Sequence, residues 1–358
     1  ALLYITMGRY AEAEPLIKRA LEIRERVLDK DHPDIAWSIN NFGWLYFKTG
    51  RYAEAELSYK KALEMRERVA GKNHPDVARM LHNLGWLYNS TGRYVEAEPL
   101  HKRGLEIRET TLRKDHPDIA SSLNDLAWLY YTMRRYKEAE PLFKRALEIR
   151  EKASWKDHPS SAAILNNMAR LYMDTKRYGE AEEFHRKALA IREKILGKNH
   201  PDLAQSLNNL ALLYFYMGRY WEAERYHKRS LEIRERALGK DHPYVAMCLR
   251  DLAHLYAATG RHGESHQFFR RGLSIMDKKR ENVFSVLSEK QKLNYMQDIK
   301  GNINAFLTHT ALHLSSDASA VMDTFDVWIR WKGAVLEAQG RYMDAVMHSE
   351  NPEIEKKF

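Results

Sequence analysis

Two neighbouring rows of polar side chains recur through the sequence at intervals of 42 residues. One row consists of Asn41, Asn83, Asp125, Asn167, Asn209 and Asp251, and the other of Asn40, His82, Asn124, Asn166, Asn208 and Arg250. A side-chain amide can donate to a carbonyl and accept from an N–H group, so such a ladder could bind an extended peptide backbone of variable sequence. The same amides could instead form hydrogen bonds between helices that fix their stacking. The sequence leaves both interpretations open.

Large aromatic side chains flank the two polar rows at spacings that keep them out of the predicted core. They are Trp37, Trp44, Phe47, Trp86, Trp128, Tyr131, Phe215 and Tyr216. Aromatic anchors dominate many binding interfaces. Some of these rings are expected to pack against a neighbouring helix instead. We predict a binding groove lined by both polar rows and these rings.

The histidines invite a metal hypothesis, because the chain has 16 of them. His-Pro pairs occur at residues 32–33, 74–75, 116–117, 158–159, 200–201 and 242–243. There is one pair in each 42-residue step, so consecutive pairs should lie about 10 Å or more apart. That separation is too large for shared coordination. We expect these histidines to cap helices, and we expect no metal and no other cofactor.

Cys248 and His254 are the one tempting pair of nucleophile and base. Six residues along a helix place them on different faces, so they cannot share a proton. Cys248 is expected to be a half-buried filler. The sequence also contains no glycine-rich phosphate loop, no paired cysteine motif and no nucleophile elbow. We therefore predict no catalytic residue in this chain.

A strict repeat explains why these residues recur together. The tripeptide Gly-Arg-Tyr at residues 8–10 returns, unchanged or with one substitution, every 42 residues. Its copies lie at 50–52, 92–94, 134–136, 176–178, 218–220 and 260–262. Such self-similarity predicts a solenoid of seven stacked repeats, the first of which begins within its first helix.

Each repeat is predicted to be an antiparallel pair of helices. Pro33 suits the first turn of a helix and Gly50 suits a left-handed stop, which gives a first helix, helix A, over 33–49. Helix B follows over 52–69. One pair cannot bury its apolar stripe alone, so the repeats must stack in tandem.

Two repeats lack the glycine at the end of helix A. Arg134 and Lys176 occupy that position. A left-handed residue that carries a Cβ atom costs about 1 kcal/mol there. We expect these two turns to be looser or differently closed.

The small and aromatic residues of one unit resemble the tetratricopeptide (TPR) consensus. They are Gly43, Tyr46, Ala55, Tyr59 and Ala62. Residues 140–151 (EPLFKRALEIRE) and 207–211 (LNNLA) more narrowly resemble the TPRs of kinesin light chains. The resemblance covers residues 1–280 and implies an all-α, right-handed superhelical solenoid whose A helices face a concave groove.

The resemblance also implies a class of function. In kinesin light chains such arrays hold short acidic or tryptophan-containing motifs of cargo adaptors. It therefore implies a non-enzymatic scaffold that binds a protein or peptide, with a cargo-adaptor role as an alternative. Arg79, Asn83 and Asn41 partly resemble the carboxylate clamp of chaperone-binding TPRs. Ser121 and Asp125 stand where that clamp needs basic residues, which favours an internal acidic motif over a C-terminal carboxylate.

The 42-residue period stops near residue 280. Residues 287–306, 327–333 and 350–353 resemble the linker of bacterial TPR proteins that end in a CHAT domain, a caspase-like peptidase module. This likeness implies the sensor or regulatory half of such a protein, with the peptidase in cis. We predict that residues 281–358 form a helical cap on the last repeat or a linker.

Composition narrows the remaining alternatives. No apolar stretch approaches the roughly 18 to 20 residues that cross a bilayer, and a single cysteine fits a reducing compartment, so we expect a cytoplasmic protein. The net charge of +9 leaves an alternative in which the groove binds RNA or a ribonucleoprotein within a defence complex. Basic residues on the A helices would favour nucleic acid, whereas basic residues elsewhere would favour peptides.

Overall fold

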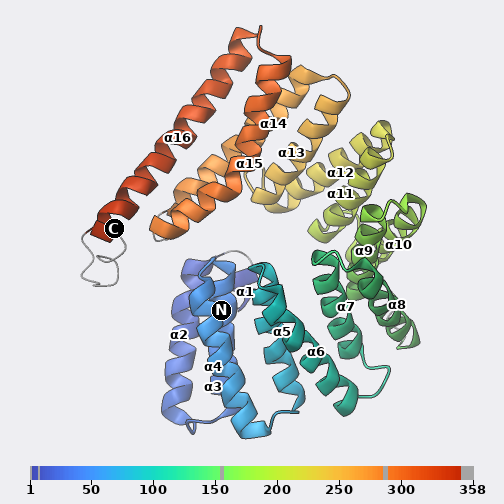
Figure 1. Ribbon diagram of the computed structural model, residues 1–358, viewed down its shortest axis with the longest axis vertical. Coiled ribbons are helices and arrows are strands. Elements are labelled where there is room, and N and C mark those ends of the chain that lie inside the picture. The colour runs from blue at the N-terminus through green and yellow to red at the C-terminus, as the bar shows by residue number, and fades with distance from the viewer. Residues whose placement is uncertain (1, 7–8, 154–156, 285–288, 348–358) are drawn as a thin grey trace. The chain divides into compact units, whose positions relative to one another are not determined.

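The computed structural model describes residues 2–6, 9–153, 157–284 and 289–347 (Figure 1). All secondary structure within these residues is helical. The chain divides into two compact units, residues 1–184 and 185–358, which are described separately. Among the described helices, none combines the length and the apolar character needed to cross a membrane.

Unit 1 is a series of helix pairs. Its helices are α1 (Leu2–Thr6), α2 (Tyr10–Val27), α3 (Pro33–Lys48), α4 (Tyr52–Ala70), α5 (Pro75–Ser90), α6 (Tyr94–Thr111), α7 (Pro117–Thr132), α8 (Tyr136–Lys152), α9 (Pro159–Asp174) and the start of α10 (Tyr178–Leu196). The prediction of helix A over 33–49 and helix B over 52–69 is confirmed by α3 and α4. We call α3, α5, α7, α9, α11 and α13 the A helices. Each B helix follows an A helix in the chain.

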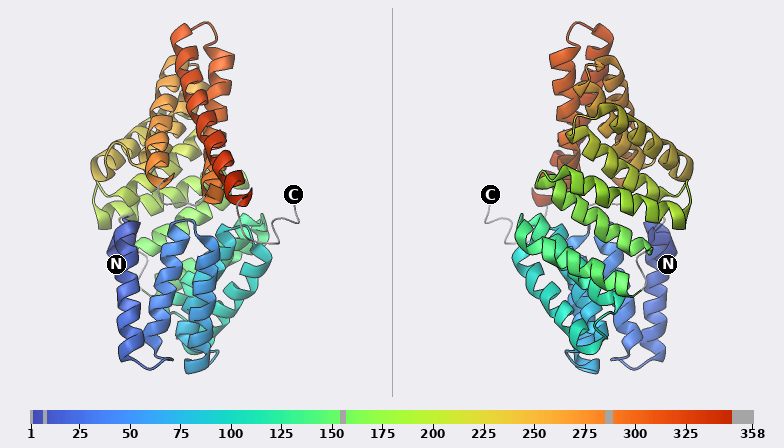
Figure 2. Two further views of the ribbon diagram at one scale, coloured as in Figure 1. Left: turned by 90° about the vertical axis from the view of Figure 1, so that its left-hand side faces the viewer. Right: turned by 90° about the vertical axis from the view of Figure 1, so that its right-hand side faces the viewer.

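Unit 2 continues the same pattern and then departs from it. It contains the rest of α10 and α11 (Pro201–Tyr216), α12 (Tyr220–Leu238), α13 (Pro243–Ala258), α14 (His262–Phe284), α15 (Glu289–His313) and α16 (Ala318–Met347). Helix α15 packs on α14 through a buried cluster that includes Phe269, Ile299 and Phe306. Helix α16 packs along α15 (Figure 2). Its Trp331 side chain packs against the same cluster. Helices α15 and α16 thus cover the last helix pair.

The His-Pro pairs begin the A helices. His32 precedes Pro33, and its Nδ1 accepts a hydrogen bond of 3.2 Å from the backbone N–H of Asp34. This contact satisfies one of the N–H groups that a helix start leaves without a partner. The other five histidines of these pairs accept in the same way: His74, His116, His158, His200 and His242. The predicted capping role is confirmed.

The arginine of the Gly-Arg-Tyr motif joins consecutive repeats. The Arg93 guanidinium lies 4.1 Å from the centre of the Tyr88 ring and pairs with Glu56 of the preceding repeat. Burial alone would raise the pKa of Glu56, but hydrogen bonds from Arg93, Lys60 and Tyr88 lower it to about 2. The same pairing recurs between Arg135 and Glu98, Arg177 and Glu140, and Arg261 and Glu224. This contact explains why the motif keeps its 42-residue spacing.

The two turns without glycine close in the ordinary way, so the expectation of a looser turn is wrong. Arg134 and Lys176 adopt φ values of 59° and 60°. Their backbone N–H groups bond to Tyr131 and Met173 at 2.9 Å, as the N–H of Gly92 bonds to Asn89 at 3.1 Å. The stacked helices on either side hold each turn in a conformation that the residue itself disfavours.

Replacing Arg134 with glycine should therefore stabilise the protein by about 1 kcal/mol, because the Arg134 side chain is exposed and its left-handed backbone is strained. The reverse change, Gly92→Arg, should cost a similar amount. Urea denaturation of both variants measures the two effects. Equal stabilities, or the opposite order, would contradict the assigned strain.

Candidate functional site

The two polar rows meet each other across consecutive A helices. In unit 1, Nδ2 of Asn83 on α5 donates to Oδ1 of Asn40 on α3 at 2.8 Å. Two repeats later, Nδ2 of Asn167 on α9 donates to Oδ1 of Asn124 on α7 at 3.0 Å. Each bond joins a residue to one 43 positions earlier, so one row binds the other row of the preceding repeat. The interpretation in which amides fix the stacking of helices is therefore realised in the structure.

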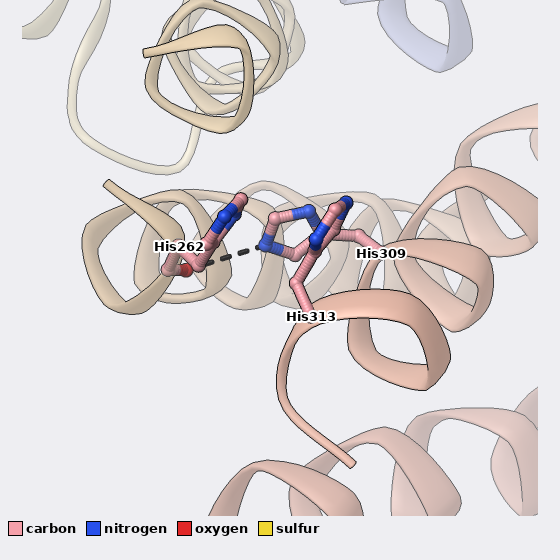
Figure 3. A group of neighbouring side chains, drawn as sticks. All are labelled: His262, His309 and His313. Atoms are coloured by element: carbon pink, nitrogen blue, oxygen red, sulfur yellow. Dashed lines mark hydrogen bonds between the residues drawn. The ribbon is translucent and has the colours of Figure 1, made fainter. Parts of the chain in front are cut away.

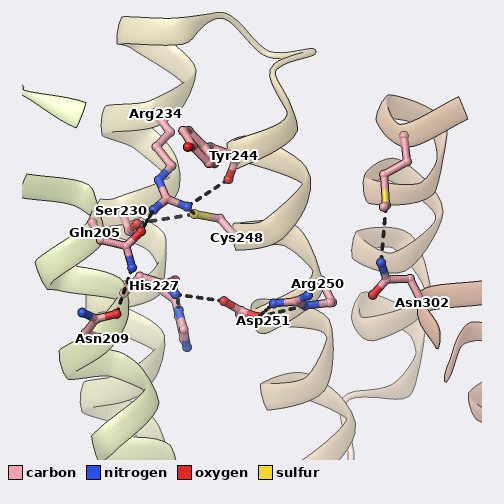
Figure 4. A network of polar contacts seen from close by, with 12 residues as sticks. Gln205, Asn209, His227, Ser230, Arg234, Tyr244, Cys248, Arg250, Asp251 and Asn302 are labelled. Carbon is pink, nitrogen blue, oxygen red and sulfur yellow. Dashed lines mark hydrogen bonds and ion pairs between the residues drawn. The ribbon is translucent and has the colours of Figure 1, made fainter. Parts of the chain in front are cut away.

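Unit 2 carries the same connection with a carboxylate as its acceptor. Nδ2 of Asn208 donates to Oδ2 of Asp251 at 2.9 Å. The guanidinium of Arg250 lies 2.9 Å from the other oxygen of the Asp251 carboxylate (Figure 4). Asn209 accepts a bond of 2.9 Å from Gln205 on its own helix. In unit 1, Asn40 and Asn166 are buried, whereas Asn41 is half-buried and makes no side-chain hydrogen bond to any described residue.

One junction replaces the amide pair with a charged pair. Nδ1 of His82 on α5 lies 2.7 Å from Oδ2 of Asp125 on α7. The negative charge of Asp125 raises the pKa of His82, against the opposing effect of burial. Burial would raise the pKa of Asp125, but His82 keeps it below the usual range. The polar rows thus tolerate either amide or charged partners, because both satisfy the same inter-helix contact.

Asn83, Asn167 and Asn209 nevertheless remain half-buried rather than sealed. The bond that Asn83 makes to Asn40 occupies one of its two N–H groups and leaves its carbonyl oxygen available. A peptide backbone could still bond to these free positions. Participation of the rows in a ligand groove stays a prediction.

Aromatic rings and arginines alternate on the neighbouring stripe of the A helices. Positions 37, 41, 44 and 48 share one face of a helix. The Arg79 guanidinium on α5 lies 4.2 Å from the centre of the Trp37 ring on α3, and Nη2 of Arg79 bonds to Asp76 at 2.9 Å. The Arg79 side chain is 57% exposed, so its guanidinium can still contact a ligand.

A second pair of this kind joins α7 and α9. The Arg170 guanidinium lies 4.9 Å from the centre of the Trp128 ring, which stacks on Tyr131 at 4.9 Å. The Tyr131 hydroxyl donates to Asp174 at 2.7 Å. Sequence reasoning missed Arg170. The available signal was its position, because it stands 42 residues after Trp128, where earlier repeats carry tryptophan.

Some tryptophans of the predicted groove pack against the core, whereas Trp86 is exposed. Trp44 packs against the cluster around Ile5 and Leu45, and Trp37 also covers part of the core beside Ile35. Trp86 is 36% exposed. The expectation that some rings pack against neighbouring helices therefore applies to Trp44 and Trp37.

Charge on the A helices differs in sign from that of the whole chain. The six A helices carry four basic residues and seven aspartates, a net charge of −3, whereas the chain carries +9. The basic residues that produce the positive total thus lie elsewhere, mainly on the B helices and loops. A polyanion would find little attraction along the A helices.

Cys248 is fully buried, which corrects the expectation of a half-buried residue. Its Sγ lies 3.1 Å from Nη1 of Arg234 and 3.4 Å from Oγ of Ser230 (Figure 4). Burial raises the pKa of the thiol, although the nearby Arg234 opposes this effect. An inaccessible thiol with a raised pKa is a poor nucleophile.

Stacked helix pairs with a polar, aromatic face on their A helices define a helical repeat scaffold of the kind that binds proteins. Family models described as tetratricopeptide repeat match residues 1–68, 58–110, 76–152, 160–236 and 222–278, and a further one matches 124–194. The chain therefore belongs to the tetratricopeptide repeat family. No curated protein matches it.

Solved structures agree with this assignment. A kinesin-light-chain candidate of nearly identical TPR-like repeats from Podosopora anserina is 29% identical, with a TM-score of 0.50 over 57% of this chain and 98% of that one. BtubC (BKLC) from P. vanneervenii is 24% identical, with a TM-score of 0.54 over 63% and 90% of the two chains. The apo form of RapI is 17% identical, with a TM-score of 0.55 over 83% and 99%. The last two share the fold.

Proposed function

We propose that the chain is a binding scaffold whose A helices hold an extended protein segment that carries aromatic and acidic side chains. We call the stripe formed by Trp37, Arg79, Trp86, Trp128, Tyr131 and Arg170 the A face of unit 1. The observation that carries the proposal is the pairing of arginine with tryptophan at two places on this stripe, Arg79 with Trp37 and Arg170 with Trp128.

The chemistry of such a pair suits two kinds of ligand group. An indole offers a large apolar surface at a low cost in conformational entropy. A guanidinium that lies over a ring keeps the donors in its plane, and these can form two hydrogen bonds with one carboxylate. The A face therefore favours a segment in which aromatic residues alternate with single acidic ones, and the half-buried amides could bond to its backbone.

Nucleic acid is the weaker candidate for the same surface. A protein that binds RNA neutralises phosphates with lysine and arginine. The net charge of −3 on the A helices opposes such binding, although the exposed rings would suit bases. The kinesin-light-chain candidate among the similar structures supports a protein ligand, and a cargo-adaptor role is one form of it.

Peptides selected from a random displayed library on the full chain should be enriched in aromatic residues with an aspartate or glutamate nearby. Fluorescence anisotropy of one labelled selected peptide then tests the site. We expect Trp128→Ala and Arg170→Ala each to weaken binding by about tenfold or more, because each removes part of one anchor.

Trp221 on α12 provides a matched control. It is 70% exposed and has the Arg225 guanidinium 5.4 Å from its ring centre, so it has the same chemistry on a B helix. Trp221→Ala should leave the affinity unchanged. An equal loss in Trp221→Ala, unchanged binding in Arg170→Ala, or displacement of the peptide by uridine homopolymer RNA would overturn the proposal.

The CHAT peptidase module in cis stays a prediction from the sequence, as does the domain boundary at residue 280. The family models match residues up to 278. Residues 350–353, which contribute to the resemblance with the CHAT linker, lie outside the described residues. In such a protein, a ligand on the A face would regulate the attached peptidase through residues 281–358.

A further inference from the structure

Three histidines come together where the last repeat meets the C-terminal segment. His262 begins α14, and His309 and His313 lie in the last turns of α15 (Figure 3). One ring nitrogen of each lies within 4.8 Å of the corresponding atoms of the other two. The His262 and His313 rings are stacked with centres 4.1 Å apart, and the His309 ring centre lies 5.4 Å from that of His262. All three belong to unit 2.

The repeat makes His262 exceptional. Its position is the tyrosine of the Gly-Arg-Tyr motif, and the other six repeats all keep that tyrosine, as Tyr10, Tyr52, Tyr94, Tyr136, Tyr178 and Tyr220. The last repeat alone has histidine, and it is the repeat against which α15 packs. On α15, His309 and His313 are four residues apart and share one face of the helix. Histidine thus replaces the tyrosine only in the repeat where His309 and His313 lie beside this position.

The hydrogen bonds around the rings leave nitrogen lone pairs free. Nδ1 of His262 is buried and has no hydrogen-bond partner among the described residues. Nε2 of His309 lies 3.3 Å from the carbonyl oxygen of His262, so its N–H can donate there and leave the lone pair on Nδ1.

We propose that His262, His309 and His313 form a binding site for a divalent transition-metal ion of the zinc type. A set of three imidazole nitrogens suits Zn²⁺, Co²⁺, Ni²⁺ or Cu²⁺ and does not suit Mg²⁺ or Ca²⁺, which prefer oxygen. Bonds of about 2.0 to 2.1 Å require the nitrogens to approach one another more closely than 4.8 Å. The exposed His313 can turn its ring to achieve this.

Such an ion would tie α14 to α15. The last helix pair would then be joined to the C-terminal segment by coordination bonds as well as by the apolar cluster of Phe269, Ile299 and Phe306. Three protein ligands leave a fourth tetrahedral position for water or for a group from a ligand. The three histidines lie in unit 2, so the metal site does not depend on the A face of unit 1.

Isothermal titration of the untagged full chain with ZnCl₂ tests the site, and the visible absorption of bound Co²⁺ reports tetrahedral coordination. We expect one ion per chain, and no heat from MgCl₂. His262→Tyr restores the residue of the other repeats, so it should fold normally and weaken zinc binding at least about tenfold. His313→Ala, at an exposed position near the end of α15, should do the same.

His254→Gln is the control, because His254 packs on Phe269 and is not part of the cluster. It should bind zinc as the unchanged chain does. Absence of zinc binding by the unchanged chain would overturn the proposal. So would equal affinity in His262→Tyr and His313→Ala, since the ion would then lie elsewhere.

Discussion

Unfolding of the protein should become easier as the pH falls from about 6.5 towards 4. Two buried histidines contribute strongly to this dependence, His101 in unit 1 and His227 in unit 2. Burial lowers the pKa of each to about 4, because a charged imidazole would lose its hydration there. His227 is further tied to Asn208, whose Oδ1 lies 2.9 Å from its Nδ1.

Stability falls with falling pH because the folded and unfolded states bind different numbers of protons. In the unfolded chain each histidine titrates near 6.5, whereas in the folded chain it resists protonation until about pH 4. Between these values the unfolded state binds more protons, so stability is complete above 6.5 and is lost as the pH falls. A shift of this size corresponds to about 3 kcal/mol for each histidine. Glu56 titrates near 2, so its pairing with Arg93 is kept through this window.

Phenylalanine provides the matched variant. Phe143 and Phe269 occupy the same position in other repeats and are buried there, so the position accepts a phenyl ring. Chemical denaturation of His227→Phe at several pH values should give a flatter stability profile than that of the unchanged chain. A profile as steep in His227→Phe as in the original would contradict the assigned role of His227.

His82 acts in the opposite direction in unit 1. Its pKa is raised by Asp125, so it contributes stability below its unfolded value of 6.5 that is lost as the pH rises. The effect of His101 in unit 1 is therefore partly offset. Asp251 opposes the effect of burial on the pKa of His227, but the net shift is still downward, to about 4. We therefore expect the steeper loss of stability to be observed through His227.

The helix boundaries could be predicted from the sequence because residues at the helix ends determine where each helix begins and stops. His32 and Pro33 begin α3, and the contact of Arg93 with the Tyr88 ring recurs because the repeat is strict. Arg134 shows where this reasoning reaches its limit. Its intrinsic preference predicts a different turn, but the packing of α7 and α8 on each other overrides a cost of about 1 kcal/mol.

The function of the polar rows depends on contacts that the sequence does not specify. Whether Asn83 faces a ligand or Asn40 depends on the rotation and separation of α3 and α5, which residue spacing within one helix leaves undetermined. The groove prediction rests on residue types that recur at the same position in several repeats. Arg170 and His262 differ from the residues at the same position in other repeats, so a search for shared residues does not find them. A comparison of each repeat with the other six at the same position would have found both.

Gly43→Ala should destabilise unit 1 by about 2 kcal/mol, even though alanine is the better helix former. A Cβ atom at position 43 would lie 2.6 Å from two carbons of the Tyr59 ring. Both residues are buried between α3 and α4, so a shift of the ring would have to displace other buried side chains. The gain of up to about 1 kcal/mol in helix propensity is smaller than the cost of separating the two helices.

Gly104→Ala is the control for this prediction. A Cβ atom at position 104 would lie 3.5 Å from the Ala78 oxygen and 3.8 Å from Leu81, which are ordinary contacts. We expect Gly104→Ala to stabilise the protein by up to about 1 kcal/mol in the same denaturation experiment. The opposite signs separate helix propensity from close packing. If Gly43→Ala were as stable as Gly104→Ala, the tight approach of α3 to the Tyr59 ring could not be what requires glycine at position 43.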